Sequence, residues 1–108
     1  MALQVAGMSF QMIEALRPLM PLIRRRDRGL ADQISRAASS VALNIAEGDF
    51  SDPGNARARF FTAAGSANET LAGLKVAIAW GYLNAGDAAA GTSLLQRLVP
   101  MLWKLARR

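Results

Sequence analysis

The chain has 108 residues, of which 52% are hydrophobic, and its formal net charge of +5 comes from 13 Lys and Arg against 8 Asp and Glu. A chain of this length is expected to form one domain, residues 1–108, with a single modest core. Because it contains neither cysteine nor histidine, a disulfide framework, a thiolate metal site and histidine-based catalysis are excluded.

The hydrophobic share is high for a small monomer and indicates apolar surface reserved for another copy of the chain. Arginine supplies eleven of the basic residues and suits bidentate contact with phosphate. The charge therefore favours nucleic-acid binding, with simple solubility as the alternative. The first basic residue is Arg17 and no apolar run approaches about 20 residues, so we expect a cytoplasmic protein with no membrane partner.

The first predicted helix covers about residues 2–25. Pro18 and Pro21 each remove a backbone donor, so we expect a kink or an early end there. Its apolar residues recur at spacings of three and four: Val5, Met8, Met12, Leu16, Leu19 and Ile23.

The second predicted helix covers about residues 30–47, with Asp27 or Gly29 near its start and Gly48 as its stop. Beside an apolar stripe it carries a polar row, spaced four, four and three residues apart, which we expect to fix helix register within or between subunits. The row is Arg36, Ser40, Asn44 and Glu47, and Glu69 of the next helix is expected to face Arg36. Glu47 is expected to accept hydrogen bonds from Arg57, Arg59 or backbone amides of the following loop. A ligand or catalytic site is the alternative reading.

The third predicted helix begins at the N-cap Asp52 with Pro53 behind it and ends at about Leu83. It carries a heptad seam of Phe60, Ala64, Ala67, Leu71, Leu74, Ile78 and Gly81. The last helix begins at Asn84, with Asp87 three positions on, and Pro100 is expected to bend it. Strand periodicity is absent, so the sequence predicts an all-α fold, an up-down-up-down four-helix bundle.

This topology places two basic clusters at opposite ends of the bundle. One lies beside the joint at residues 83–87, and the other lies beside Asp49 and Asp52. These clusters are the candidate nucleic-acid-binding residues: Arg24, Arg25, Arg26 and Arg28 at one end, and Lys104, Arg107 and Arg108 at the other. Trp80, Tyr82 and Trp103 either stack on bases or pack at the bundle end or between subunits.

No catalytic residue, metal site or cofactor is predicted. A di-iron bundle needs four carboxylates and two Glu-x-x-His pairs, whereas this chain has three glutamates and no histidine.

The second helix also carries the pattern L-x-x-Q-I-x-R-A-x-x-S-x-x-x-N-I-A-E-G, from Leu30 to Gly48. This pattern resembles the four helix bundle protein family, also called the 23S rRNA intervening-sequence protein family. Later features are similar too: Phe60-Phe61 followed by Ala64-Gly65-Ser66, then Glu69, and Gly81-Tyr82-Leu83. The resemblance spans about residues 8–105.

The resemblance implies a bundle that assembles as a homopentamer. Some members are encoded within ribosomal RNA intervening sequences. Others are similar to the accessory variability determinant of diversity-generating retroelements, a basic pentamer that binds nucleic acid and partners a reverse transcriptase. We therefore predict a non-enzymatic homo-oligomeric scaffold or accessory protein that binds RNA or DNA, or a reverse-transcriptase-like partner. A purely structural oligomer, or a small-ligand or peptide binder in the groove between protomers, is the alternative.

Overall fold

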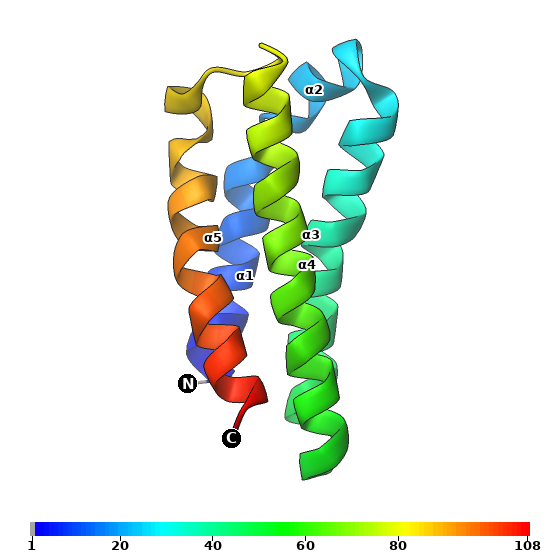
Figure 1. Ribbon diagram of the computed structural model, residues 1–108, viewed down its shortest axis with the longest axis vertical. Coiled ribbons are helices and arrows are strands. Elements are labelled where there is room, and N and C mark those ends of the chain that lie inside the picture. Colours follow the sequence, from blue (N-terminus) through cyan, green and yellow to red (C-terminus); the bar gives the residue numbers. More distant parts are fainter. Residues whose placement is uncertain (1) are drawn as a thin grey trace.

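Residues 2–108, the part of the chain that the computed structural model describes, contain five α-helices and no strand. Four of them lie side by side along the long axis of the molecule, and the short α2 lies at one end (Figure 1). The helices are α1 (Ala2–Leu16), α2 (Met20–Arg26), α3 (Arg28–Asp49), α4 (Pro53–Ala79) and α5 (Ala85–Ala106). The all-α prediction is confirmed, but there is one helix more than the four predicted.

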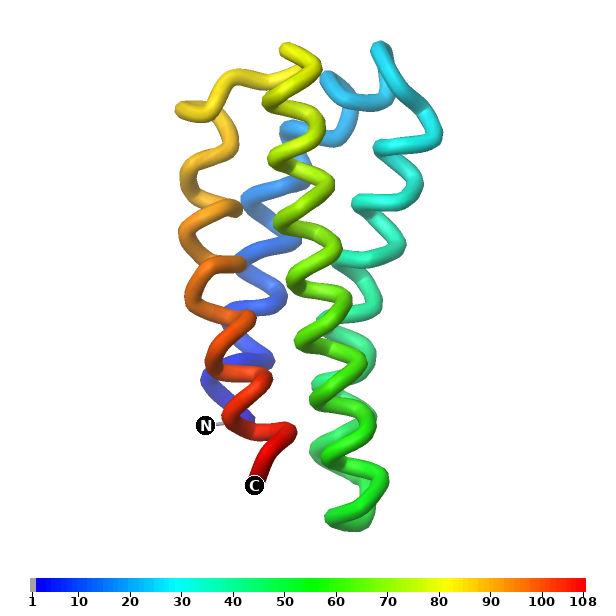
Figure 2. The backbone as a smooth tube through the Cα atoms, viewed as in Figure 1, coloured from blue at the N-terminus to red at the C-terminus, as the bar shows by residue number. Residues whose placement is uncertain are grey.

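The extra helix arises because the first predicted helix is divided at its prolines. Pro18, in the turn that follows α1, has no backbone N–H to donate, and Pro21 lies in the first turn of α2, where a helix needs no backbone donor. Instead the N–H of Leu19 donates to the carbonyl of Leu16 at 2.8 Å, which closes a tight turn. The backbone trace changes direction between α1 and α2 at this turn (Figure 2).

The helices α3, α4 and α5 each begin at an Asp or Asn side chain. The sequence predicted Asp52 and Asn84, and it gave Asp27 as one of two candidates. These side chains satisfy a backbone N–H that has no partner in the first turn of a helix. The N–H three residues on donates in each case: Leu30 to Asp27 at 3.0 Å, Asn55 to Asp52 at 3.0 Å, and Asp87 to Asn84 at 2.7 Å.

α4 ends earlier than predicted, at Ala79 rather than near Leu83. The cause is Gly81, whose φ of +79° places it in the left-handed region that side chains disfavour. The N–H of Gly81 donates to Ile78 and that of Tyr82 to Ala77, each at 2.9 Å. This pair of bonds is a Schellman motif, and it turns the chain toward α5.

The prediction that Gly48 stops the second helix is wrong, because α3 continues through Asp49. Gly48 is buried inside the last turn, and a Cβ there would lie 3.0 Å from the Phe60 ring of α4. The glycine is therefore needed for close packing of α3 against α4, not for a left-handed C-cap.

The core fills the space between four mutually packed helices, in which α1 and α4 each pack against α3 and α5. The seam of α4 is buried through Leu74, and α5 continues as a helix through Pro100. Two further glycines permit close approach: a Cβ at Gly73 would lie 2.6 Å from Ile34, and one at Gly91 would lie 2.9 Å from Leu16.

No helix of residues 2–108 has the length and apolar character needed to cross a membrane.

Candidate functional site

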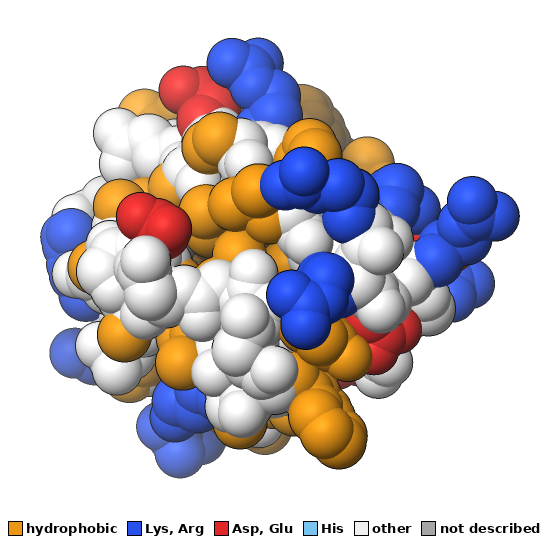
Figure 3. All heavy atoms as spheres, turned by 90° about the horizontal axis from the view of Figure 1, so that it is seen from above, with side chains coloured by type: hydrophobic (Ala, Val, Ile, Leu, Met, Phe, Trp, Pro, Cys, Tyr) orange, Lys and Arg blue, Asp and Glu red, His pale blue; other side chains and the backbone are white. Residues whose placement is uncertain are grey.

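The predicted basic clusters lie at opposite ends of a molecule about 42 Å long (Figure 1). The arginine-rich end is formed by α2, the start of α3 and the α4–α5 turn. Viewed along the long axis, Lys and Arg side chains are spread over this face, with exposed hydrophobic side chains between them (Figure 3). Both termini lie at the opposite end (Figure 2).

One arginine of the first cluster is neutralised within the molecule. Arg24 pairs with Asp32 of α3, and this hydrogen bond lowers the pKa of the Asp32 carboxyl below its ordinary value. The other three arginines are exposed and form no ion pair with any residue that the structure describes: Arg25, Arg26 and Arg28. They are the cations of this end that remain available to phosphate.

The carboxyl-terminal cluster is likewise exposed. Lys104, Arg107 and Arg108 make no ion pair within the described part of the chain, although Arg108 and Asp49 line one depression of about 290 Å³. Asp52 is engaged elsewhere, since Asn55 donates to it from its backbone and its side-chain amide. These hydrogen bonds lower the pKa of the Asp52 carboxyl.

The predicted polar row forms a hydrogen-bonded contact between α3 and α4. Ser40 Oγ lies 2.8 Å from Ser66 Oγ, so the two hydroxyls join the helices. Asn44 Nδ2 donates to the Ser40 carbonyl at 2.9 Å and to its hydroxyl at 3.0 Å. Ser66, which lies in the Ala64-Gly65-Ser66 stretch, was not among the residues predicted for this network.

The ends of the row behave differently from its centre. Glu47 pairs with Arg59 at 2.9 Å, not with Arg57, and both partners are about half exposed. Arg36 and Glu69 are exposed and form no ion pair with each other, so neither joins the network. Glu69 follows Ser66 by three residues, which rotates it by about 60° around α4, away from the contact with α3.

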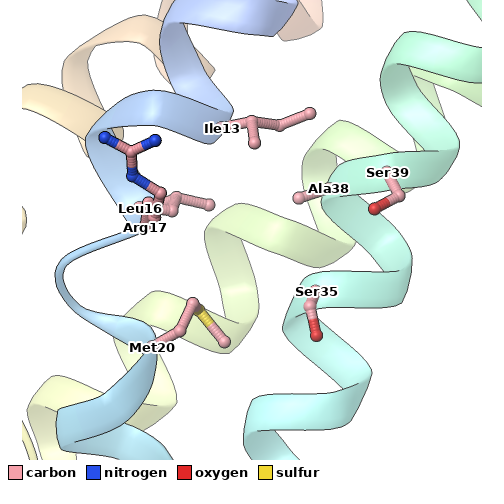
Figure 4. Close-up of a pocket in the computed structure, with 7 residues that line it drawn as sticks. All are labelled: Ile13, Leu16, Arg17, Met20, Ser35, Ala38 and Ser39. Atoms are coloured by element: carbon pink, nitrogen blue, oxygen red, sulfur yellow. The ribbon is translucent and has the colours of Figure 1, made fainter.

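Two depressions flank α3. The larger, about 520 Å³, is wide open and runs along the polar row from Ser35 to Arg59. The smaller, about 190 Å³, is mostly apolar and lies between Ile13, Leu16, Arg17 and Met20 on one side and Ser35, Ala38 and Ser39 of α3 on the other (Figure 4). Within residues 2–108 no three Asp or Glu side chains gather as a metal site would require.

Comparison with known proteins agrees with the resemblance seen in the sequence. The sequence model described as 23S rRNA-intervening sequence protein matches residues 1–104. A solved structure from Bacteroides thetaiotaomicron, described as a protein with unknown function from the S23 ribosomal protein family, has a similar fold, with a TM-score of 0.86. The two chains are 18% identical, and the match covers 96% of this chain and 99% of the other. No curated protein matches this chain. The chain therefore belongs to the 23S rRNA-intervening sequence protein family.

Proposed function

We propose that this chain is a non-enzymatic scaffold or accessory protein that assembles with copies of itself, as a pentamer, and binds nucleic acid through its basic ends. In this proposal α1 and α2 act together as the first rod of an up-down-up-down four-helix bundle. The proposal is carried by one observation: two exposed apolar faces lie on opposite sides of the molecule, and exposed arginines lie at its tip.

The first apolar face lies over α1 and α3. Phe10 is 57% exposed and Leu43 is 63% exposed, although burying either side chain would stabilise the protein by about 1.5–3 kcal/mol. Phe10 lies one turn before Ile13, and Leu43 lies one turn after Ser39. Ile13 lines the pocket between α1 and α3, whereas Leu43 itself lines the open depression along the polar row. Ser35 and Ser39 line both hollows, so the two exposed side chains lie beside adjoining hollows on this side of the molecule.

The second apolar face lies over α4 and α5. Phe61 and Trp103 pack edge to face, with ring centroids 5.2 Å apart, and both remain partly exposed. One turn along α4, a Cβ placed on Gly65 would meet nothing within 4 Å. The face thus combines apolar rings with space for the backbone of another helix.

The order of packing sets these faces opposite each other, because α1 and α3 form one side of the array and α4 and α5 form the other. Two different faces favour head-to-tail association, in which one face of each copy meets the other face of the next. Such contacts close into a ring when the rotation between copies permits. The resemblance implies that the ring has five members.

The exposed arginines support nucleic-acid binding. Each phosphate contact releases condensed counterions, so affinity should fall steeply as salt rises. We expect RNA or DNA to bind the protein at low salt, with a linear loss of log affinity against log salt. Binding that does not depend on salt, or no binding at low salt, would contradict this part of the proposal. The same ends suit a partner that itself holds nucleic acid, such as a reverse transcriptase.

Assembly is tested by the mass of two variants, alone and mixed. Leu43→Asp places a charge in the first face and Phe61→Asp places one in the second, while Gln33→Asp adds the same charge at an exposed polar position of α3. Each face variant should be monomeric in light scattering, and the control should keep the mass of the unmodified protein. An equimolar mixture of the face variants should form a dimer and nothing larger, because one intact contact remains. A monomeric unmodified protein, or a mixture that stays monomeric, would refute head-to-tail assembly.

The alternatives receive less support from the geometry. A site for a small molecule usually encloses about 300–1,000 Å³. The apolar pocket beside α3 is smaller, at about 190 Å³, and the larger depression is open to solvent. A purely structural oligomer is separated from the proposal by the salt-dependent binding assay.

A further inference from the structure

The arginine-rich end also carries an aromatic pair. Trp80 and Tyr82 flank Gly81 at the end of α4, with ring planes 15° apart and centroids 6.5 Å apart. Trp80 is 69% exposed, which makes it one of the most exposed large apolar side chains in the molecule. A tryptophan in this position presents ring surface to solvent beside a cluster of cations.

Tyr82 is held in place from two directions. The Arg26 guanidinium lies 5.5 Å from the centre of its ring, and its hydroxyl lies 3.5 Å from the Asp27 carboxylate. Asp27 is fixed in turn, because it caps α3 through the Leu30 N–H. The cation–π contact therefore positions Arg26 as well as Tyr82, and less side-chain entropy is lost when a ligand binds.

A depression of about 330 Å³ connects the Tyr82 ring, which is paired with Trp80, to the arginines. Its lining is Leu22, Arg25 and Arg26 from α2, together with Tyr82. Neither Arg25 nor Arg26 forms an ion pair with any residue from 2 to 108, whereas their neighbour Arg24 is taken by Asp32. Exposed cations and an exposed ring thus lie within reach of one short ligand.

This combination matches the chemistry of single-stranded nucleic acid. Unpaired bases stack on aromatic rings, and arginines beside the rings bind the phosphates between successive bases. A duplex keeps its bases stacked on one another and offers chiefly its phosphates. At the opposite end the Trp103 ring is packed against Phe61, and although Phe50 is 93% exposed there, no cation–π contact within residues 2–108 holds an arginine against its ring.

We propose that this end of the molecule is a binding site for single-stranded nucleic acid, in which an unpaired base stacks on Trp80 and the flanking phosphates bind Arg25 and Arg26. The proposal rests on the nucleic-acid binding proposed above and goes further: it names the residues that select single strands over duplexes.

The test compares a labelled single-stranded oligouridylate with an RNA duplex by fluorescence anisotropy at fixed low salt. Trp80→Ala should weaken single-strand binding by about 5- to 150-fold and leave duplex binding within about twofold. Trp80→Phe, which keeps a ring, should restore most of the affinity. Arg26→Ala should weaken binding of both probes more than Arg97→Ala, which removes one exposed charge from the middle of α5.

Each result decides the matter. Equal loss for both probes in Trp80→Ala, no loss for either, or a smaller assembly mass would overturn the stacking site and assign Trp80 to general packing or to a subunit contact. Equal affinity of the unmodified protein for both probes would overturn it as well. These results leave salt-dependent binding intact, whereas failure to bind either probe at low salt would overturn the proposed function itself.

Discussion

The close approach of α3 and α4 at Gly73 gives a prediction whose size can be worked from the structure. A Cβ at residue 73 would lie 2.6 Å from Ile34 Cγ1, about 1 Å inside a normal carbon contact. Rotating Ile34 about χ2 moves only its Cδ1, and χ1 of a β-branched residue in a helix is largely fixed. Ile34 is also buried, so it cannot turn outward. The clash can be relieved only by separating the two helices.

Gly73→Ala should therefore destabilise the fold, although alanine is the better helix former by about 1 kcal/mol. Overpacking of a core costs about 1–3 kcal/mol, which equals or exceeds that gain. Gly65→Ala is the matched control, because it makes the same change in the same helix where the new methyl group meets nothing. The propensity term cancels between the variants, so Gly65→Ala should exceed Gly73→Ala in stability by about 1–3 kcal/mol.

Thermal unfolding followed by circular dichroism measures this difference, which corresponds to roughly 4–20 °C in Tm for a domain of this size. Both variants should be compared at one protein concentration and in the Leu43→Asp background, because self-association raises Tm. Equal Tm values, or a higher value for Gly73→Ala, would refute the argument that the glycine is required by Ile34.

Three further predictions concern the polar contacts. Glu47→Gln should lower the unfolding free energy by no more than about 1 kcal/mol, because its pair with Arg59 is half exposed; calorimetry showing no change at all would remove any structural role for that pair. Asn44→Leu removes both hydrogen bonds to Ser40, and light scattering should show a smaller assembly if the row adjoins a subunit boundary; an unchanged mass places the row within one protomer. Asp52 has a lowered pKa in the folded state, so its capping contribution is complete at neutral pH and is lost as the pH falls below its ordinary value of 3.8. Asp52→Asn, which caps without titrating, should therefore lose less Tm between pH 7 and pH 3 than the unmodified protein does, and equal losses would contradict this account.

The parts of the fold that depend on local chemistry could be predicted from the sequence. Asp52-Pro53 and Asn84 predicted the starts of two helices, because an N-cap depends only on residues within one turn. The prolines at positions 18 and 21 were recognised as an interruption, which the structure resolves as the end of α1.

The parts that depend on packing could not be predicted. Gly48 satisfies the local criterion for a helix stop, but it lies inside α3 against the Phe60 ring of α4, a contact that the local sequence does not reveal. The pairing of the polar row also depended on the rotation of α4, which placed Ser66 rather than Glu69 against α3. The stacking of Trp80 on Tyr82 could not be predicted either, because it depends on the turn that Gly81 makes with its positive φ.

The position of the apolar faces along the sides of the rod has a consequence for avidity. In a cyclic assembly closed through those sides, every copy points in the same direction. One rim would then repeat the Trp80 end at regular intervals, and the other rim would repeat the carboxyl-terminal end. A nucleic-acid strand bound at one protomer would meet the site on the next protomer at high effective concentration. Several weak contacts along the Trp80 rim would then give tight overall binding, which the other rim would not share.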